Sequence, residues 1–129
     1  MANKSSNPVK KFVSAEYSIT NGDSGAAGSV TPKKTSFVPE NAIMTDCIIH
    51  CNKAVVSSTG TIKVEAGGRE LTVDVLSSHA LATGAALQPA LAASATAIKS
   101  AAGGGHIKAK ITGTVTAGEV SITVGYIDA

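Results

Sequence analysis

The stretch TIKVEAGGRELTVDVL, residues 61–76, decides the fold class of this chain. On both sides of Gly67-Gly68 apolar and polar residues alternate, which is the pattern of two half-buried strands joined by a tight turn. The side chains expected to face a core are Ile62, Val64, Leu71, Val73 and Val75. Those expected to face solvent are Lys63, Glu65, Glu70, Thr72 and Asp74. The stretch therefore predicts an antiparallel β-hairpin.

Five further segments around this hairpin have the pattern of strands or short extended pieces. They are residues 9–20, 35–38, 42–53, 106–113 and 119–127. Turn signals such as Asn21-Gly22-Asp23 separate them, so the chain contains six or seven short strands. Alternating strands at this spacing are typical of antiparallel sheets with one wet face. We predict an all-β fold, an antiparallel β-sandwich of jelly-roll-like architecture.

Two of these strands have faces that strict alternation assigns. In residues 9–20 the apolar face is Val13, Ala15, Tyr17 and Ile19, and the opposite face is Phe12, Ser14, Glu16 and Ser18. In residues 42–53 one face is Ile43, Thr45, Cys47, Ile49 and Cys51, and the other is Met44, Asp46, Ile48 and His50. Because both faces of the second strand carry apolar groups, we expect it to lie centrally in a sheet.

The length of 129 residues indicates a single domain with few large side chains. Ala, Gly, Ser and Thr occupy 61 of the positions, and Trp is absent. We divide the chain into an extended N-terminal arm, residues 1–12, and one β-sandwich domain, residues 13–129. The Gly-rich residues 21–34 are expected to form a flexible loop. A core with so few large residues predicts that the chain gains stability by packing on copies of itself or on a host surface.

The Ala-rich residues 77–102 are the ambiguous part of the chain. Their composition favours helix, whereas Gly84 and Pro89 interrupt any long one. We expect one or two short helical turns, near residues 78–82 and 90–100.

Cys47 and Cys51 are the first candidates for chemistry. Four residues apart on one strand they share a face but lie about 13 Å apart, too far for a disulfide. A zinc site needs four converging ligands, and His50 points to the opposite face of that strand. The pattern therefore predicts two buried, reduced thiols.

Other catalytic or ligand-binding arrangements are weak in this sequence. His50, His79 and His106 are scattered and no nucleophile with a base accompanies them, so we expect no enzyme, no catalytic residue, no cofactor and no metal. Asp46 is interpreted as paired with a lysine or facing an interface rather than as catalytic. The triplet at residues 103–105 matches no phosphate-binding loop and predicts a flexible connection before a strand.

Charge and hydropathy exclude two further classes of partner. Eleven basic and nine acidic residues leave a net charge of +2, and the pairs Lys10-Lys11 and Lys33-Lys34 have no aromatic residues interleaved with them. No run of apolar residues approaches the 18 that a membrane helix needs, and the polar N-terminus has no signal-peptide core. We therefore expect neither a nucleic acid nor a membrane as partner.

Several runs of the sequence resemble a group of small tailed-bacteriophage virion proteins. The runs are VPENAIMTDCIIHCNKAV, GTIKVEAGG and GAALQPALAASATAIKSAAGGGHIKAKITGTVTAGEVSITVGYI. The motifs that carry the resemblance lie at residues 43–46, 60–64, 95–99, 116–118 and 124–127, within residues 38–128. The group resembles head decoration (cement) proteins and other auxiliary capsid components.

The resemblance implies a structural virion protein, made in the host cytoplasm and carried on the capsid surface. It would decorate and stabilise a bacteriophage capsid by binding at junctions of the major capsid protein, as a homo-oligomer such as a trimer. Residues 1–12 are the favoured capsid contact and residues 21–34 the second. The alternatives are a phage tail or fibre component, including a head-fibre base involved in attachment, and a small hydrolase or ligand-binding β-domain.

Overall fold

The computed structural model describes residues 9–57, 60–72, 75–76, 84, 86–89, 91 and 99–128. This part of the chain contains no helix, and hence no helix long and apolar enough to cross a membrane. The short helical turns expected near residues 78–82 and 90–100 lie outside the described residues, apart from Leu91, Lys99 and Ser100. Leu91 forms an isolated bridge with Thr72, and Lys99 forms one with Ile43.

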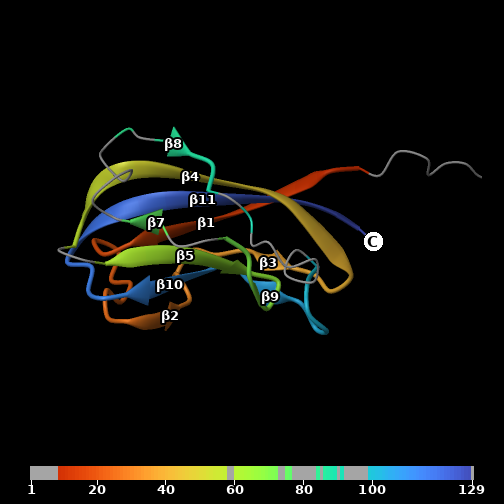
Figure 1. The fold of residues 1–129 in the computed structure, drawn as a ribbon, viewed down its shortest axis with the longest axis horizontal. Coiled ribbons are helices and arrows are strands. Elements are labelled where there is room, and N and C mark those ends of the chain that lie inside the picture. Colours follow the sequence, from red (N-terminus) through yellow and green to blue (C-terminus); the bar gives the residue numbers. More distant parts are fainter. Residues whose placement is uncertain are drawn as a thin grey trace, which may run out of the picture.

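Two antiparallel sheets stacked on one another form the body of the protein (Figure 1). Sheet A has the order β1 (Lys11–Ser18), β11 (Ala117–Asp128), β4 (Ala42–Val56) and β8 (Ala86–Leu87). Sheet B has the order β2 (Gly28–Val30), β10 (Lys108–Thr112), β5 (Thr61–Ala66) and β6 (Arg69–Glu70), and β7 (Val75–Leu76) also pairs with β5. A third, two-stranded sheet pairs β3 (Phe37–Val38) with β9 (Gly105–His106).

The strand pairs show that the chain is one long antiparallel ribbon folded over on itself. The first strand pairs with the last, β2 with β10, β3 with β9, β4 with β8, and β5 with β6 and β7. The pairs β4–β11 and β5–β10 then join separate parts of the ribbon side by side, the first within sheet A and the second within sheet B. This wrapped ribbon is the arrangement of a jelly roll. The predicted antiparallel, jelly-roll-like sandwich is confirmed.

The turn of the hairpin that decided the fold class lies at the tip of this ribbon. Gly67 and Gly68 join β5 to β6 with φ values of +62° and +79°. Two successive positive φ angles are what a type I′ hairpin turn requires, and only glycine adopts them without steric cost. The expected tight turn is confirmed.

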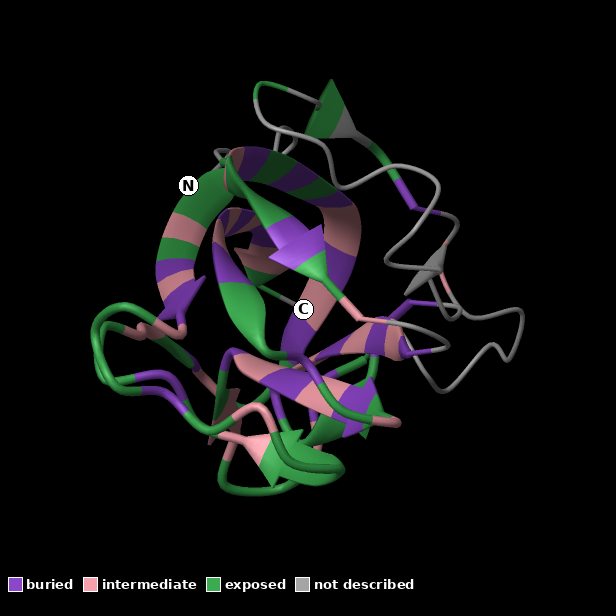
Figure 2. Ribbon diagram, turned by 90° about the vertical axis from the view of Figure 1, so that its left-hand side faces the viewer, coloured by how far each residue is buried: buried purple, intermediate pink, exposed green. Residues whose placement is uncertain are grey.

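The core lies between the two sheets, and the strands alternate between buried and accessible residues along their length (Figure 2). Its largest fully buried members are Tyr17, Met44, Ile49, Ile62, Leu71, Ile107, Ile111 and Ile122. Tyr17 keeps its hydroxyl satisfied by donating to the carbonyl oxygen of Ser24 at 2.7 Å. Burial raises the pKa of Tyr17 to about 12, so this hydroxyl stays a donor at physiological pH.

In the strand at residues 42–53, the side chains that face the core do not all come from one of the two predicted faces. Met44 and Cys47 are both buried, although strict alternation placed them on opposite faces. The register of β4 against β11 shifts between the pairs Gly125–Asp46 and Tyr126–Met44, so Thr45 is an extra residue in β4. Such a bulge inverts the alternation beyond it. The prediction for Met44 is wrong because the sequence pattern does not reveal the bulge.

The predicted strand over residues 69–76 is interrupted. Leu71 is buried as expected, whereas Thr72, expected to face solvent, is also buried. The N–H groups of both residues donate to the carbonyl oxygen of Val64, so the backbone kinks there and turns Thr72 inward. The Thr72 hydroxyl oxygen accepts a hydrogen bond from the N–H of Val64, which satisfies it within the core.

Two N-terminal expectations meet the structure differently. The Gly-rich residues 21–34 contain β2, and the buried Asp23 carboxylate accepts hydrogen bonds from the N–H groups of Ser18 and Lys33 across the base of the loop. β1 begins at Lys11, inside the range expected to form an arm, and residues 1–8 of that arm lie outside the described residues. The division into arm and domain stays a prediction.

Candidate interaction surface

The two cysteines occupy the core, as their pattern predicted. Both are free thiols and both are buried in β4. Burial raises the pKa of the Cys47 thiol to about 12 and also raises the pKa of the Cys51 thiol, whose sulfur donates to the carbonyl oxygen of Lys53. Because a neutral thiol is a poor nucleophile and metal ligand, these residues pack the core and offer no reactive site.

Asp46 pairs with a lysine, which is one of the two roles expected for it from the sequence. Its carboxylate lies 2.7 Å from Nζ of Lys10 and also accepts a hydrogen bond from the Thr45 hydroxyl at 3.1 Å. The hydrogen bond from Lys10 is the main cause that lowers the pKa of Asp46. Phe12 lies beside this pair, with its ring centroid 6.0 Å from Nζ of Lys10. The four residues form one cluster at the end of sheet A.

Gly125 allows the Phe12 ring and the Asp46 carboxylate to lie close together over β11, because it has no side chain. It lies in β11 between Phe12 on β1 and Asp46 on β4. A Cβ atom at this position would lie 2.8 Å from the Phe12 ring and 2.9 Å from the Asp46 carboxylate. The ring and the carboxylate therefore cover the surface that a side chain at Gly125 would occupy.

The histidines lie apart from one another. His50 is exposed on β4 and its Nδ1 lies 2.9 Å from the Asn52 side-chain oxygen, whereas His106 packs edge-on against Phe37 with ring centroids 5.1 Å apart. His79 lies outside the described residues. Among the residues that the structure does describe, no three His, Cys, Asp or Glu side chains lie together so as to hold a metal ion.

The triplet at residues 103–105 forms a packed turn. Gly104 has φ +68°, and a Cβ there would lie 2.4 Å from the carbonyl oxygen of Val38. A Cβ on Gly105 would lie 2.5 Å from the N–H nitrogen of Gly68. Glycines at these sites therefore let two turns from opposite halves of the ribbon touch, which is a structural role and not that of a flexible connection.

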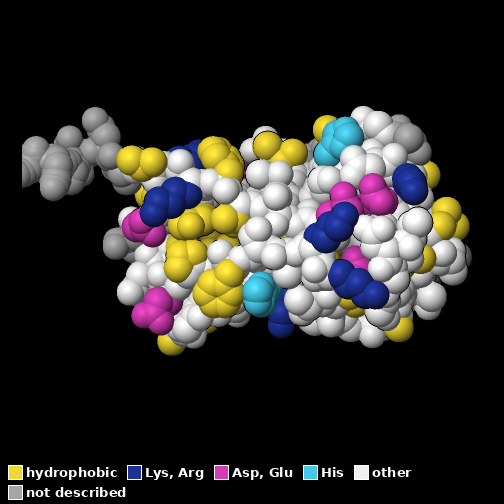
Figure 3. All heavy atoms as spheres, turned by 180° about the vertical axis from the view of Figure 1, so that it is seen from behind, with side chains coloured by type: hydrophobic (Ala, Val, Ile, Leu, Met, Phe, Trp, Pro, Cys, Tyr) yellow, Lys and Arg dark blue, Asp and Glu magenta, His cyan; other side chains and the backbone are white. Residues whose placement is uncertain are grey.

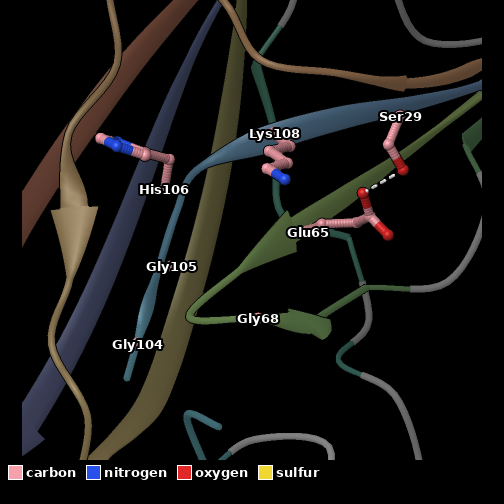
Figure 4. A pocket seen from close by; sticks show the side chains of 7 residues that line it. All are labelled: Ser29, Glu65, Gly68, Gly104, Gly105, His106 and Lys108. Atoms are coloured by element: carbon pink, nitrogen blue, oxygen red, sulfur yellow. Dashed lines mark hydrogen bonds between the residues drawn. The ribbon is translucent and has the colours of Figure 1, made fainter. Parts of the chain in front are cut away.

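Beside these glycines lies a hollow of about 310 Å³ (Figure 4). It is lined by Ser29, Glu65, Gly68, Gly104, Gly105, His106 and Lys108. The Glu65 carboxylate accepts a hydrogen bond of 2.6 Å from the Ser29 hydroxyl, and Lys108 is its neighbour on the adjacent strand. Glu65 and Lys108 thus place one carboxylate and one ammonium group on the lining of the hollow.

A second feature is the outer edge of β1, which is the end strand of sheet A. The N–H of Glu16 donates to the carbonyl oxygen of Lys34 at 2.8 Å, so it points away from β11. Because strand residues alternate, the N–H and C=O groups of Phe12 and Ser14 point the same way. No residue in the described part of the chain hydrogen-bonds these groups. We call the backbone of residues 10–14 on this side the open edge.

The surroundings of the open edge are accessible and partly apolar. Val9 is 72% exposed and Phe12 is 58% exposed. A hollow of about 430 Å³ lies beside residues 14–16 of β1 and residues 34–36. Figure 3 shows hydrophobic side chains gathered at the end of the molecule where the described chain begins, with charged side chains both beside them and toward the other end. The open edge is therefore accessible to another extended segment.

The outer surfaces of the two sheets differ in where their charges lie, because those of sheet A, such as Lys10, Asp46 and Glu16, flank an uncharged central row. We call face A the outward side chains of β1, β11 and β4, whose central row is Ser14, Thr123 and Ile48. We call face B the outward side chains of β2, β10, β5 and β6. Face B carries Lys63, Glu65, Lys108, Lys110 and Glu70. Ile48, in the uncharged row of face A, is 43% exposed.

The sequence identified Asp46 and the cysteines but missed the open edge and Ile48. Phe12 was assigned to an arm, although it shares a strand face with Ser14 and Glu16. A lone aromatic on an otherwise polar strand face was the available signal, because such a side chain exposes a large apolar area to water. No local signal identifies an edge strand, since edges are defined by pairing between distant segments.

Comparison with known proteins supports the fold. No protein-family model and no curated protein matches the sequence. Two solved structures contain a chain that this protein matches over its whole length. One is the capsid asymmetric unit of cyanophage Pam1, with a TM-score of 0.62, 15% identity and 91% of that chain covered. The other is the capsid of Ralstonia phage GP4, with a TM-score of 0.58, 14% identity and 89% of that chain covered. At such identity the likeness concerns the fold, which is one that phage capsid structures contain.

Proposed function

We propose that this chain is a structural virion protein that decorates and stabilises a bacteriophage capsid by binding at junctions of the major capsid protein. The observation that carries the proposal is the match, over the whole chain, to a chain in each of two phage capsid structures. This chain spans about nine-tenths of each matched chain, so the matched capsid components are only slightly longer than this chain. The resemblance of the sequence to small virion proteins of tailed phages points the same way.

The character of the molecule suits such a role. In the two hollows described above, the Ser29 hydroxyl meets the Glu65 carboxylate, but no hydrogen bond joins His106 to this pair among the described residues, so we propose no enzymatic activity, no cofactor and neither nucleic acid nor membrane as partner. A decoration protein needs a rigid body and a complementary surface. Many weak contacts repeated over a lattice then add to a stable attachment, because each bound copy staples neighbouring subunits.

Face A is the surface that we assign to the capsid. Its central row of Ser14, Thr123 and Ile48 presents no charge, so burying it against another protein carries a low desolvation cost. Burying face B would require desolvation of several lysines and carboxylates, which is costly unless each is paired across the interface. The homo-oligomer and its place on the capsid surface, after synthesis in the host cytoplasm, belong to this proposal.

The test is to mix the purified full-length chain with capsids that lack it and to measure binding by co-sedimentation. We expect saturable binding and an increase in the temperature at which the particles release their DNA. Absence of binding contradicts the proposal. Electron microscopy of virions carrying a tagged chain tests the alternative of a tail or fibre component, because the tag would then lie at the tail and not over the head.

A further inference from the structure

We propose that two copies of this chain associate through their β1 strands, antiparallel and across a two-fold axis, so that sheet A continues from one copy into the other. The proposal rests on the homo-oligomer of the proposed function and names the surface that forms it. It starts from the open edge, where the outward N–H and C=O groups of Phe12 and Ser14 have no partner in the described part of the chain.

The free length of the edge sets the register. The bond between the N–H of Glu16 and the carbonyl oxygen of Lys34 closes one end, so pairing is available over residues 10–14. Phe12 lies at the centre of this segment. A two-fold axis there places Phe12 of one copy opposite Phe12 of the other, and Lys10 opposite Ser14. The outward groups of residues 10, 12 and 14 then exchange about six backbone hydrogen bonds.

In this arrangement the charges along the β1 edge of one copy are complementary to those along the edge of the second copy. Lys10, which binds Asp46 in its own copy, lies diagonal to Glu16 of the second copy, within reach of long side chains on one sheet face. The two Phe12 residues flank the axis, each with its ring over Gly125 of its own copy, and the second strand covers part of a residue that is 58% exposed. The basic end of each strand thus approaches the acidic residue of the other, and this charge complementarity favours a second copy as the occupant.

Apart from the Glu16–Lys34 contact, no described segment pairs with this edge of β1, which leaves residues 10–14 free for a second strand. The hollow of about 430 Å³ lies at the closed end, where Ser14, Glu16 and residues 34–36 line it. An unprotected edge strand is also a liability for aggregation, which proteins avoid by covering or pairing it. Pairing of two copies covers both edges at once and closes the assembly as a dimer. It also aligns the uncharged rows of the two copies of face A on one surface.

Sedimentation equilibrium of the full chain, from about 1 to 100 µM, tests the proposal with Ser14→Pro and its matched control Ser14→Ala. Proline removes the outward N–H, which no described residue uses within the chain, and it is tolerated at strand edges. We expect the wild type and Ser14→Ala to dimerise equally and Ser14→Pro to dissociate at least about tenfold more readily. If Ser14→Pro fails to fold, Phe12→Lys replaces it, because it places like charges directly opposite one another.

Three results overturn the proposal: a wild type that stays monomeric at 100 µM, a dimer that Ser14→Pro leaves intact, or a trimer. Capsid binding is measured separately on the same variants. A monomeric Ser14→Pro that still binds capsids, though more weakly, leaves both proposals standing. A wild-type dimer that binds no capsid contradicts the proposed function alone.

Discussion

Face A and face B belong to the same sandwich and rest on the same core, yet they offer opposite surfaces to a partner. Face B carries lysines and carboxylates on neighbouring strands, and Glu70 binds both Lys63 and Lys110. Across the middle of face A lie Ser14, Thr123 and Ile48. The two faces cost different amounts to dehydrate, so one sandwich can keep one side in water and dock with the other.

The largest effect that we predict concerns the reactivity of Cys47, which lies in the core that both faces share. At pH 8 a thiol of pKa about 12 has roughly a thousandth of the thiolate of an ordinary cysteine, so Cys47 should react with a disulfide reagent roughly a thousandfold more slowly than a free thiol. Absorbance of the released thiolate measures the rate for the native protein and for the protein in urea. Fast reaction of the native protein would show that the two sheets separate readily.

Placing a lysine on each face in turn tests directly which face binds the capsid. Ile48→Lys on face A should weaken capsid binding at least about tenfold, because a charge is then buried without a partner. Thr112→Lys, on an exposed residue of face B, is the matched control and should leave binding unchanged. Both sites are exposed, so melting temperatures should stay close to that of the wild type. Equal loss of binding in the two variants would contradict the assignment of face A.

The cluster at the end of face A predicts a moderate effect. Gly125→Ala places a Cβ within 3 Å of the Phe12 ring and the Asp46 carboxylate, so one of them must move. We expect a loss of about 1 kcal/mol in the free energy of unfolding, measured in urea, because the displaced side chains are partly exposed. In Phe12→Ala/Gly125→Ala the loss should be smaller than the sum of the two single losses, since the main clash is then absent. An additive result would show that the ring does not cover Gly125.

The ion pairs of the two faces give the smallest effect. Hydrogen bonds from lysines lower the pKa of Asp46 on face A and of Glu70 on face B. A carboxyl whose pKa is lower in the folded state stabilises the fold above its ordinary pKa, and this contribution is lost as pH falls through the lowered value. Both pairs are accessible to solvent, so the contribution to stability is small.

Titration followed by NMR of the carboxyl carbons distinguishes these two pairs. Lys10→Met should raise the pKa of Asp46 toward its ordinary value. Lys110→Met should raise the pKa of Glu70 only in part, because Lys63 still lies 3.2 Å from its carboxylate. A full return of the Glu70 pKa in the single variant would show that Lys63 makes no effective contact.

Much of the fold followed from the sequence because its signals are local. Alternation in residues 61–66 identified β5, and the two glycines after it identified the turn, since only glycine takes two positive φ angles there cheaply. The inward face of β1, with Ala15 and Tyr17 buried, was predicted in the same way. The burial of both cysteines followed once β4 was recognised as a central strand.

Other features depend on contacts between distant segments, and the sequence left them undetermined. The bulge at Thr45, which turns Met44 into the core, arises from the register of β4 against β11. The pairing of Asp46 with Lys10 specifically requires β1 and β4 to flank the same glycine of β11. Neither the bulge nor the ion pair can be read from the residues of a single strand.

The sequence by itself determined which segments become strands, where the chain turns, and which side chains avoid water. Tertiary structure alone decided which strands lie at the edges and where charges gather on each face. The physical reason is that alternation is set by each strand's own residues, whereas an open edge exists only where the wrapped ribbon leaves β1 without a second neighbour.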